Sequence, residues 1–177
     1  MPSIFTHAVT AAALGVVMLP RGVRTSTLLT GMACAVLPDL DVIAFAAGVE
    51  YGHPLGHRGL THSFFFALLL AALLAWRGRG TEAGGRRFGY YALCAASHGV
   101  LDAFTNGGLG VGFFLPFDST RYFFPVTPIE VSPIGAGFFS QRGWHTLLSE
   151  LRWVWLPSAV LTALALVWRR RNAPRGS

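Results

Sequence analysis

The stretch SFFFALLLAALLAW, residues 63–76, decides the fold class because it contains no charged side chain. Such a run predicts a helix in an apolar environment, and VWLPSAVLTALALVW at residues 154–168 has the same character. Of the 177 residues of the chain, 53% are hydrophobic and 12% are charged, whereas soluble domains average about 25% charged residues. The composition therefore argues against a water-soluble globule or a disordered chain and predicts an integral membrane protein.

Five apolar runs predict an all-α, polytopic membrane bundle of about four or five transmembrane helices. They are Ile4 to Leu19, Thr25 to Asp41 with a tail to Val49, His62 to Trp76, Phe88 to Phe104, and Trp153 to Trp168. Each run is shorter than the roughly 20 residues that span a bilayer core, so tilt or local thinning has to help. No basic residue precedes the first run, so we expect no cleaved signal peptide and a retained helix that either spans or lies in the interface. We expect one membrane domain over residues 1–168 and a basic cytoplasmic tail over 169–177.

All fourteen basic residues are arginine, and they lie in the gaps between the apolar runs. If every run crosses the membrane, one side collects Arg21, Arg24, Arg77, Arg79, Arg86, Arg87, Arg169, Arg170, Arg171 and Arg175. The opposite side holds Arg58, Arg121, Arg142 and Arg152. Because cytoplasmic loops carry the excess of arginine, we expect the amino terminus outside and the carboxyl terminus in the cytoplasm. The positive-inside rule accounts for these arginines, and so for the net charge of +6, without a bound polyanion. We therefore expect no nucleic-acid partner.

The segment Thr105 to Glu150 lies outside under this topology and shows no helical periodicity. It is rich in Gly, Pro and Phe, as in GGLGVGFFLPF at residues 107–117. Backbone that forms no helix cannot face lipid tails directly. We therefore expect an irregular, aromatic-rich segment that lies at the headgroups or folds over the bundle as a lid. The alternative is an external linker without fixed structure.

Four polar clusters interrupt the apolar runs: Thr6-His7, LPDLD at residues 37–41, GHRGLTHS at 56–63, and SHGVLD at 97–102. Ionisable side chains within or beside membrane helices are costly and mark functional sites. His98 and Asp102 are four residues apart, so on a helix they share a face and can bind one metal ion or form a carboxylate–histidine pair. The structural alternative is a buried pair that holds two helices together.

Asp39 and Asp41 are two residues apart and follow Pro38, which disfavours helical geometry at Leu37. We expect the second run to end or break there, with both carboxylates on the same side of extended backbone. Two converging carboxylates form a hard-oxygen metal site, or a ligand beside a general base. The alternative is that one Asp caps a new short helix through VIAFAAGV, residues 42–49.

The GHRGLTHS cluster combines two histidines with an arginine. Its two glycines indicate a turn, which places His57 in a loop and His62 in the first turn of the third helix. We expect Thr61 to cap that helix and Arg58 to hold a phosphate with two hydrogen bonds. The alternative for Arg58 is a side chain that extends to the lipid headgroups.

Under the expected topology these clusters reach a similar depth near the outer side of one bundle. The seven candidate ligands are His7, Asp39, Asp41, His57, His62, His98 and Asp102. Imidazoles and carboxylates suit Zn²⁺, Fe or Mn²⁺, and we expect roughly one to three ions with Zn²⁺ as the first choice. Cys34 and Cys94 stand alone in apolar stretches, which excludes a disulfide scaffold or a cysteine-ligated zinc module and predicts two buried thiols. His53 and His145 lack a partner in sequence, and Glu130 is a weaker candidate.

In order and character, these blocks resemble the YdjM family of inner-membrane metal-dependent hydrolases. The likeness runs over roughly residues 4 to 125: Thr6-His7, LPDLD, GHRGLTHS and SHGVLD, then Thr105 and a Gly-rich turn that leads to Leu115-Pro116. The family is similar in turn to zinc-dependent phospholipase C and the S1/P1 nucleases, which bind zinc on a helical bundle through His and Asp. The resemblance implies that the seven candidates are the metal ligands and that the protein lies in a bacterial inner membrane.

Two functions from different classes follow. The first is a membrane-bound, metal-dependent hydrolase that cleaves a phosphoester in a lipid or lipid-linked substrate at the outer face of the inner membrane. In this function Asp39 or Asp41 accepts a proton, and Arg58 or Arg121 holds the phosphate. The second is a transporter or sensor in which the same cluster handles protons or metal ions. Transport sites usually lie near the midplane between repeated halves, and the sequence shows neither feature.

Overall fold

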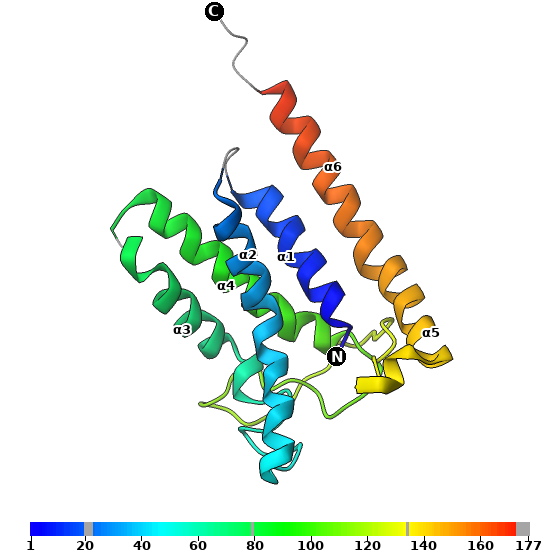
Figure 1. Cartoon of the computed structure of the whole chain (residues 1–177). Helices are drawn as coiled ribbons and strands as arrows, with labels where there is room; N and C mark the ends of the chain where they lie inside the picture. The colour runs from blue at the N-terminus through cyan, green and yellow to red at the C-terminus, as the bar shows by residue number, and fades with distance from the viewer. Residues whose placement is uncertain (20–22, 79, 134, 173–177) are drawn as a thin grey trace, which may run out of the picture.

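The computed structural model describes residues 1–19, 23–78, 80–133 and 135–172. Within these ranges the regular structure is helical and no strand occurs, apart from two isolated bridges that pair Thr105 with Ile129 and Val111 with Tyr122. The predicted all-α class is therefore confirmed for the described residues. Figure 1 shows the helices as a bundle, with the start of the chain and the last described residues at opposite ends.

The bundle is built from α-helices that shorter helical turns join. The α-helices are α1 (Ile4–Met18), α2 (Thr25–Val36), α3 (Phe64–Ala75), α4 (Glu82–Ala103), α5 (Gln141–Glu150) and α6 (Leu156–Arg171). The 3₁₀ segments are η1 (Leu37–Ala47), η2 (Leu60–His62), η3 (Trp76–Gly78) and η4 (Gly135–Phe139), and η5 (Leu151–Trp155) is a π-helical turn. Since η1 continues α2 and η5 joins α5 to α6, the chain forms two long rods, Thr25–Ala47 and Gln141–Arg171.

Small side chains bring the first four α-helices into close contact. α3 packs on α4, α4 on α2, and α2 on α1. Their shared buried residues are mostly small: Ala11, Cys34, Ala35, Ala67, Ala71, Ala75, Cys94 and Ala95. Such residues let helix backbones approach, which is how membrane helices pack without a hydrophobic driving force. Tyr90 lies among them and donates a hydrogen bond to the carbonyl oxygen of Ala11 (3.0 Å). The predicted burial of both cysteines is confirmed.

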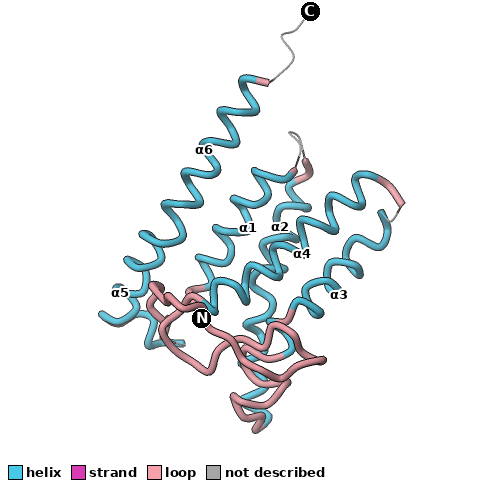
Figure 2. The backbone as a smooth tube through the Cα atoms, turned by 180° about the vertical axis from the view of Figure 1, so that it is seen from behind, coloured by secondary structure: helices cyan, strands magenta, loops and turns pink. Residues whose placement is uncertain are grey.

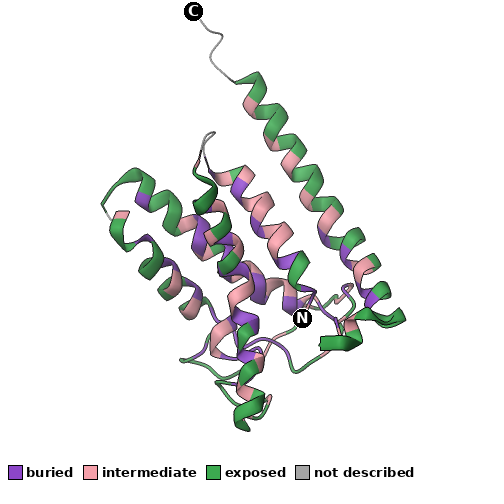
Figure 3. Ribbon diagram, viewed as in Figure 1, coloured by how far each residue is buried: buried purple, intermediate pink, exposed green. Residues whose placement is uncertain are grey.

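Large apolar side chains cover the outside of the bundle. Leu73 in α3 and Leu164 and Trp168 in α6 are each more than 60% exposed, and Figure 3 shows the exposed faces along these helices. An apolar exterior of this kind suits contact with lipid. By length and composition the two long rods can cross a membrane, while Ile4–Met18 and Phe64–Gly78 are shorter apolar helices. The structure thus establishes two candidate spans, fewer than the four or five expected.

Three predicted boundaries need correction. The fourth helix begins at Glu82 rather than Phe88, because Thr81 caps it by accepting a hydrogen bond from the Gly84 N–H (2.9 Å). The segment after residue 104 is not irregular throughout, since its last ten residues form α5. α6 continues to Arg171, so the first residues of the predicted tail are helical. Residues 173–177 of that tail lie outside the described residues.

Residues 105–133 fold back over one end of the bundle, and we call this stretch the lid. Figure 2 shows the loops gathered at the end where the chain starts. The Phe64 N–H donates a hydrogen bond to the carbonyl oxygen of Phe113 (3.0 Å), and their rings stack with centroids 5.0 Å apart. The Gly112 N–H donates to the carbonyl oxygen of Arg58 (2.9 Å). An unstructured linker is therefore wrong for this stretch.

Replacing Gly31 with Ala is expected to destabilise the bundle. A Cβ at this position would lie 2.3 Å from the ring of Tyr90, which is completely buried and has no room to move. We expect a loss of about 1–3 kcal/mol, seen as a lower thermal unfolding temperature in detergent. Gly85→Ala in α4 is the control, because a Cβ there meets nothing within 4 Å and alanine favours the helix. Equal unfolding temperatures for the two variants would contradict this packing.

Candidate metal centre

The four polar clusters meet at the end of the bundle that the lid covers. His7 lies at the start of α1, Asp39 and Asp41 in η1, His57 in the loop that follows, His62 in η2, and His98 and Asp102 near the end of α4. None of the seven is more than 9% exposed. Two groups share His62: Asp39, His62, His98 and Asp102 form one, and Asp41, His57 and His62 form the other. Within each group the candidate ligand atoms lie within 4.8 Å of one another.

His98 shows the chemistry of the first group most clearly. Its Nδ1 donates a hydrogen bond to the carbonyl oxygen of Ala35 (2.7 Å), an atom that can only accept. In a neutral His98 the Nε2 atom therefore carries a lone pair. That lone pair faces Nε2 of His62 at 3.0 Å and Oδ1 of Asp39 at 3.2 Å. Lone pairs and carboxylate oxygens that face one another at this distance require a cation between them, either a proton or a metal ion.

Asp102 lies one helical turn after His98 on the same face of α4, as their spacing predicts. Its carboxylate is completely buried and lies 3.0 Å from Nε of Arg58, 3.5 Å from Nε2 of His62 and 3.7 Å from Nε2 of His7. Among the described residues neither oxygen has a hydrogen-bond partner of good geometry. Asp102 therefore keeps lone pairs that can bind a cation.

His7 of α1 lies beside the first group but is not a member of it. Its ring stacks on that of His98 with centroids 3.8 Å apart, and neither ring nitrogen has a hydrogen bond within the described chain. The start of α1 is fixed by Glu150, a completely buried carboxylate at the end of α5. Glu150 accepts hydrogen bonds from the hydroxyls of Ser3 (2.5 Å) and Thr6 (2.8 Å). This network ties α5 to α1 and positions His7.

The second group is held by hydrogen bonds to Asp41. Nδ1 of His57 donates to Oδ1 of Asp41 (2.7 Å), and the hydroxyl of Thr61 donates to Oδ2 (2.7 Å). Nδ1 of His62 lies 3.2 Å from the same Oδ2. Because His57 donates through Nδ1, its Nε2 carries the lone pair and is free to bind a metal ion or a proton.

The charges of the centre favour a cation. The centre contains three carboxylates and one guanidinium, so it carries excess negative charge when its imidazoles are neutral. Burial lowers the pKa of His62 in η2, but hydrogen bonds to Asp102, Asp39 and Asp41 outweigh it and raise that pKa to about 10. The oxygens of Asp39 and Asp102 and the nitrogens of His7 are buried without hydrogen-bond partners in the described part of the chain. These nitrogen and oxygen donors fit a Zn²⁺, Fe or Mn²⁺ ion.

The backbone around Asp39 and Asp41 differs from the prediction. The α-helix α2 ends at Val36, as Pro38 predicts, but Pro38 lies in the first turn of η1, where its missing N–H costs no hydrogen bond, so the chain continues as a 3₁₀ helix. Residues two apart on a 3₁₀ helix are roughly 240° apart. Asp39 therefore points to His98 and Asp41 to His57. The expected extended backbone is wrong, and neither Asp is the N-cap of this segment.

The cap of α3 also differs. Ser63 accepts a hydrogen bond from the backbone N–H of Phe66 (3.1 Å), so Ser63 rather than Thr61 is the N-cap. His62 precedes the helix in the short turn η2 instead of lying in its first turn. The hydroxyl of Thr61 is free to bind Asp41 because it is not used as a cap.

Arg58 is completely buried and does not extend to the headgroups. Its guanidinium pairs with Asp102 and donates hydrogen bonds to the carbonyl oxygen of Gly107 and the hydroxyl of Thr105, both at 2.7 Å. Arg121 donates to backbone carbonyl oxygens of the loop before η2. The two arginines expected to hold a phosphate thus fasten the lid, and Arg58 is a positioning residue.

The remaining candidates lie apart from the centre. His53 and His145 are exposed, and Glu130 is exposed with its carboxylate bound by the side-chain amide of Asn106 (2.8 Å). The sequence analysis missed Glu150. The sequence does contain a feature that could have identified it, because Glu150 is the single acidic residue between Gln141 and Arg171.

Comparison with known proteins covers nearly the whole chain. The family model of YdjM inner membrane proteins matches residues 1–173. The chain is 37% identical to inner membrane protein YbcI from Escherichia coli strain K12 over 174 aligned residues. The alignment covers 97% of this chain and 100% of that relative. No solved structure matches the chain significantly. The family match extends beyond residue 125, where the resemblance in the sequence blocks ends, and includes α5 and α6.

We expect protein purified in detergent to bind a divalent transition metal. His98→Ala and Asp102→Asn should each weaken zinc binding by about 100-fold or more, because outer-shell partners of a metal site alone are worth 10- to 100-fold. The measurements are elemental analysis and zinc titration against a competing chelator. His145→Ala is the control, since this exposed histidine lies outside both groups. Full metal retention in His98→Ala and Asp102→Asn would show that the ligand assignment is wrong.

Glu150→Gln is expected to weaken zinc binding although Glu150 is not a ligand. The variant keeps the shape of the side chain but removes the negative charge that accepts hydrogen bonds from Ser3 and Thr6. Hydrogen bonds to a charged group contribute about 1.5–3 kcal/mol to stability, so we expect a loss of that size. A looser start of α1 should lower zinc affinity less than His98→Ala does. Thermal unfolding with and without zinc measures both effects, and unchanged values in both would contradict a positioning role.

Proposed function

Because the chain belongs to the YdjM family of inner membrane proteins, we propose that it is a membrane-bound, metal-dependent hydrolase that cleaves a phosphoester in a lipid or lipid-linked substrate. One observation carries the proposal. Nε2 of His98, Nε2 of His62 and Oδ1 of Asp39 converge on one point inside the protein, beside a second group that shares His62. A cation held by the first group, next to a histidine that can act as a general base, suits phosphoester hydrolysis.

The proposed topology has four or five helices that cross the membrane, with the centre near the outer face. The arginines at the end away from the centre support this orientation through the positive-inside rule. Those that the structure describes are Arg24, Arg77, Arg86, Arg87, Arg169, Arg170 and Arg171. Arg21, Arg79 and Arg175, assigned to the same side, lie outside the described residues. The arginine-rich end, including the end of α6, then lies in the cytoplasm.

A lipid substrate is favoured by the surface beside the centre. Asp39 and Asp41 keep the largest exposed fractions of the seven candidates, 8% and 9%, so η1 is the side of the centre that lies nearest the surface. On η1 the large apolar side chains Leu40 and Ile43 are 58% and 65% exposed. Apolar surface next to a buried polar centre suits a substrate with an acyl or isoprenoid chain.

The residues divide the chemistry between them. A divalent cation held by Asp39, His62, His98 and Asp102 would act as a Lewis acid that polarises a phosphoryl oxygen and lowers the pKa of a water molecule. Asp41 orients His57 through Nδ1, so that the lone pair of Nε2 can accept a proton from water. Arg58 neutralises part of the charge of Asp102 and holds the lid. The partner for the phosphate is then the cation, since the guanidinium groups of Arg58 and Arg121 are engaged.

The test is turnover of defined phosphoesters by the zinc-loaded protein in detergent. We expect hydrolysis of phosphatidylglycerol or a polyprenyl diphosphate that a chelator abolishes and Zn²⁺ restores. His57→Ala should lower kcat by about 100-fold or more, the usual contribution of a general base. Glu130→Gln is the control, because this exposed carboxylate lies away from the centre.

The same preparation separates hydrolysis from ion handling. Zinc bound at the centre without turnover of either lipid would contradict the hydrolase. In proteoliposomes, zinc flux that is lost in His98→Ala would then favour the transporter, which uses the same buried cluster.

A further inference from the structure

A second polar cavity lies at the opposite end of the bundle from the metal centre. It has a volume of about 610 Å³ and lies between the end of α1, the start of α2 and the start of α4. The size is within the range of ligand pockets in proteins. Along α4, Arg87 at this cavity precedes His98 by eleven residues, which is about 16 Å of helix. The cavity is therefore separate from the metal centre.

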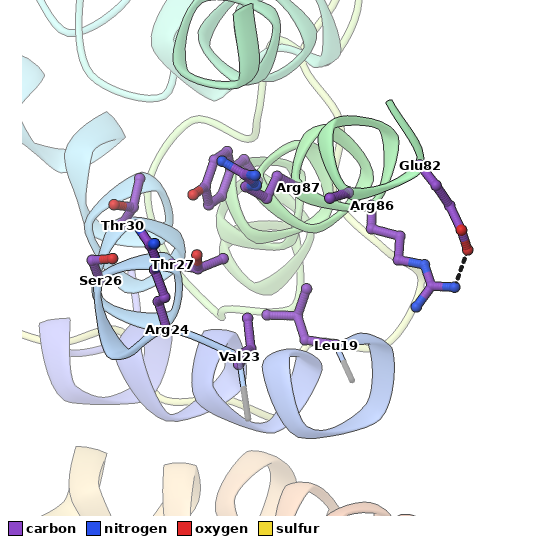
Figure 4. A pocket seen from close by; sticks show the side chains of 11 residues that line it. Leu19, Val23, Arg24, Ser26, Thr27, Thr30, Glu82, Arg86 and Arg87 are labelled. Atoms are coloured by element: carbon purple, nitrogen blue, oxygen red, sulfur yellow. Dashed lines mark hydrogen bonds and ion pairs between the residues drawn. The ribbon is translucent and has the colours of Figure 1, made fainter. Parts of the chain in front are cut away.

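The walls of the cavity are basic. In Figure 4 the residues at and after the start of α2, Arg24, Thr27 and Thr30, lie across the opening from Arg87 of α4. Arg86 turns outward to pair with Glu82. Within the described ranges, Arg24 and Arg87 have neither an acidic partner nor a hydrogen bond. Two uncompensated guanidinium groups on facing walls make this an anion-binding environment.

Thr27 gives an independent indication of a ligand. Its side chain lines the cavity and is 92% buried, with an exposed fraction of 8%. Its hydroxyl has no hydrogen-bond partner among the residues that the structure describes and is not one of the fully buried atoms, so it is available to a ligand in the cavity. Thr27 also belongs to the first turn of α2, a helix of 12 residues whose N-terminal end attracts negative charge. An anion in the cavity can accept a hydrogen bond from this hydroxyl.

We propose that this cavity binds a phosphoryl group, held by Arg24 and Arg87 and by the hydroxyl of Thr27. Arginine binds phosphate oxygens with two parallel hydrogen bonds, and the helix end adds a favourable dipole. Leu19 and Val23 give the cavity an apolar wall beside the basic one. The phosphoryl group belongs either to an anionic phospholipid or to a soluble phosphate ester. The inference does not depend on hydrolysis at the metal centre.

The test compares binding of two probes to the purified full-length protein. Inorganic phosphate is titrated by calorimetry, and phosphatidylglycerol against phosphatidylcholine is measured by native mass spectrometry. Arg87→Gln should weaken binding by about 10-fold and Thr27→Val, which keeps the side-chain shape, by about 3-fold. Arg77→Gln is the matched control, because it removes the same charge at the same end of the bundle without lining the cavity. An unchanged thermal unfolding temperature in detergent shows that each variant is folded.

The outcomes separate the sources of the phosphoryl group. Preference for phosphatidylglycerol over phosphatidylcholine, lost in Arg87→Gln and Thr27→Val, supports a lipid headgroup. Binding of inorganic phosphate without that preference, with the same losses, supports a soluble phosphate ester. The proposal is overturned if neither probe binds, or if Arg77→Gln weakens binding as much as Arg87→Gln does.

Discussion

The buried carboxylate of Asp102 is the constraint on which the centre and the lid depend. A completely buried negative charge is tolerated when cations or strong donors surround it, and removal of one partner of a buried pair costs about 3–5 kcal/mol. Asp102 takes its contacts from Arg58, His62 and His7, which come from two separate parts of the chain, the GHRGLTHS cluster and the start of α1. To reach Asp102, Arg58 adopts a φ of 61°, a left-handed conformation that is uncommon outside glycine. The same guanidinium binds Gly107, so one ion pair also sets the path of the lid.

The members of the centre could be identified from the sequence because membrane helices make them conspicuous. Histidine and aspartate inside runs such as SHGVLD are costly, so each one requires a structural or chemical reason. The spacing of His98 and Asp102 fixes their shared helix face without any tertiary information. The burial of Cys34 and Cys94 followed from their apolar neighbours in the same way. Local patterns thus predicted which side chains converge and that they lie at one end of the bundle.

Features that depend on distant contacts could not be predicted from local patterns. Glu150 binds Ser3, 147 residues away in sequence, and no periodicity links the two. Asp39 and Asp41 follow a proline, which commonly ends a helix, but here the chain continues as a 3₁₀ segment that carries each carboxylate to a different histidine. Asp39 and Asp41 were therefore correctly predicted to belong to the centre, but the predicted reason, that both lie on the same side of extended backbone, is wrong. The sequence predicts that Arg58 holds a phosphate, because its partner Asp102 is remote in sequence and the ion pair between them cannot be seen from local patterns.

The two polar ends of the molecule share the same helices. The α2–η1 rod carries Thr27 at one end and Asp39 at the other, and α4 carries Arg87 and Asp102 at its corresponding ends. Between the ends, Tyr90 of α4 packs against Gly31 of α2, with no space for even one added methyl group. This contact therefore fixes how α2 and α4 lie against each other between the two ends. The small residues that let the bundle close thus also set the positions of its two polar ends relative to each other.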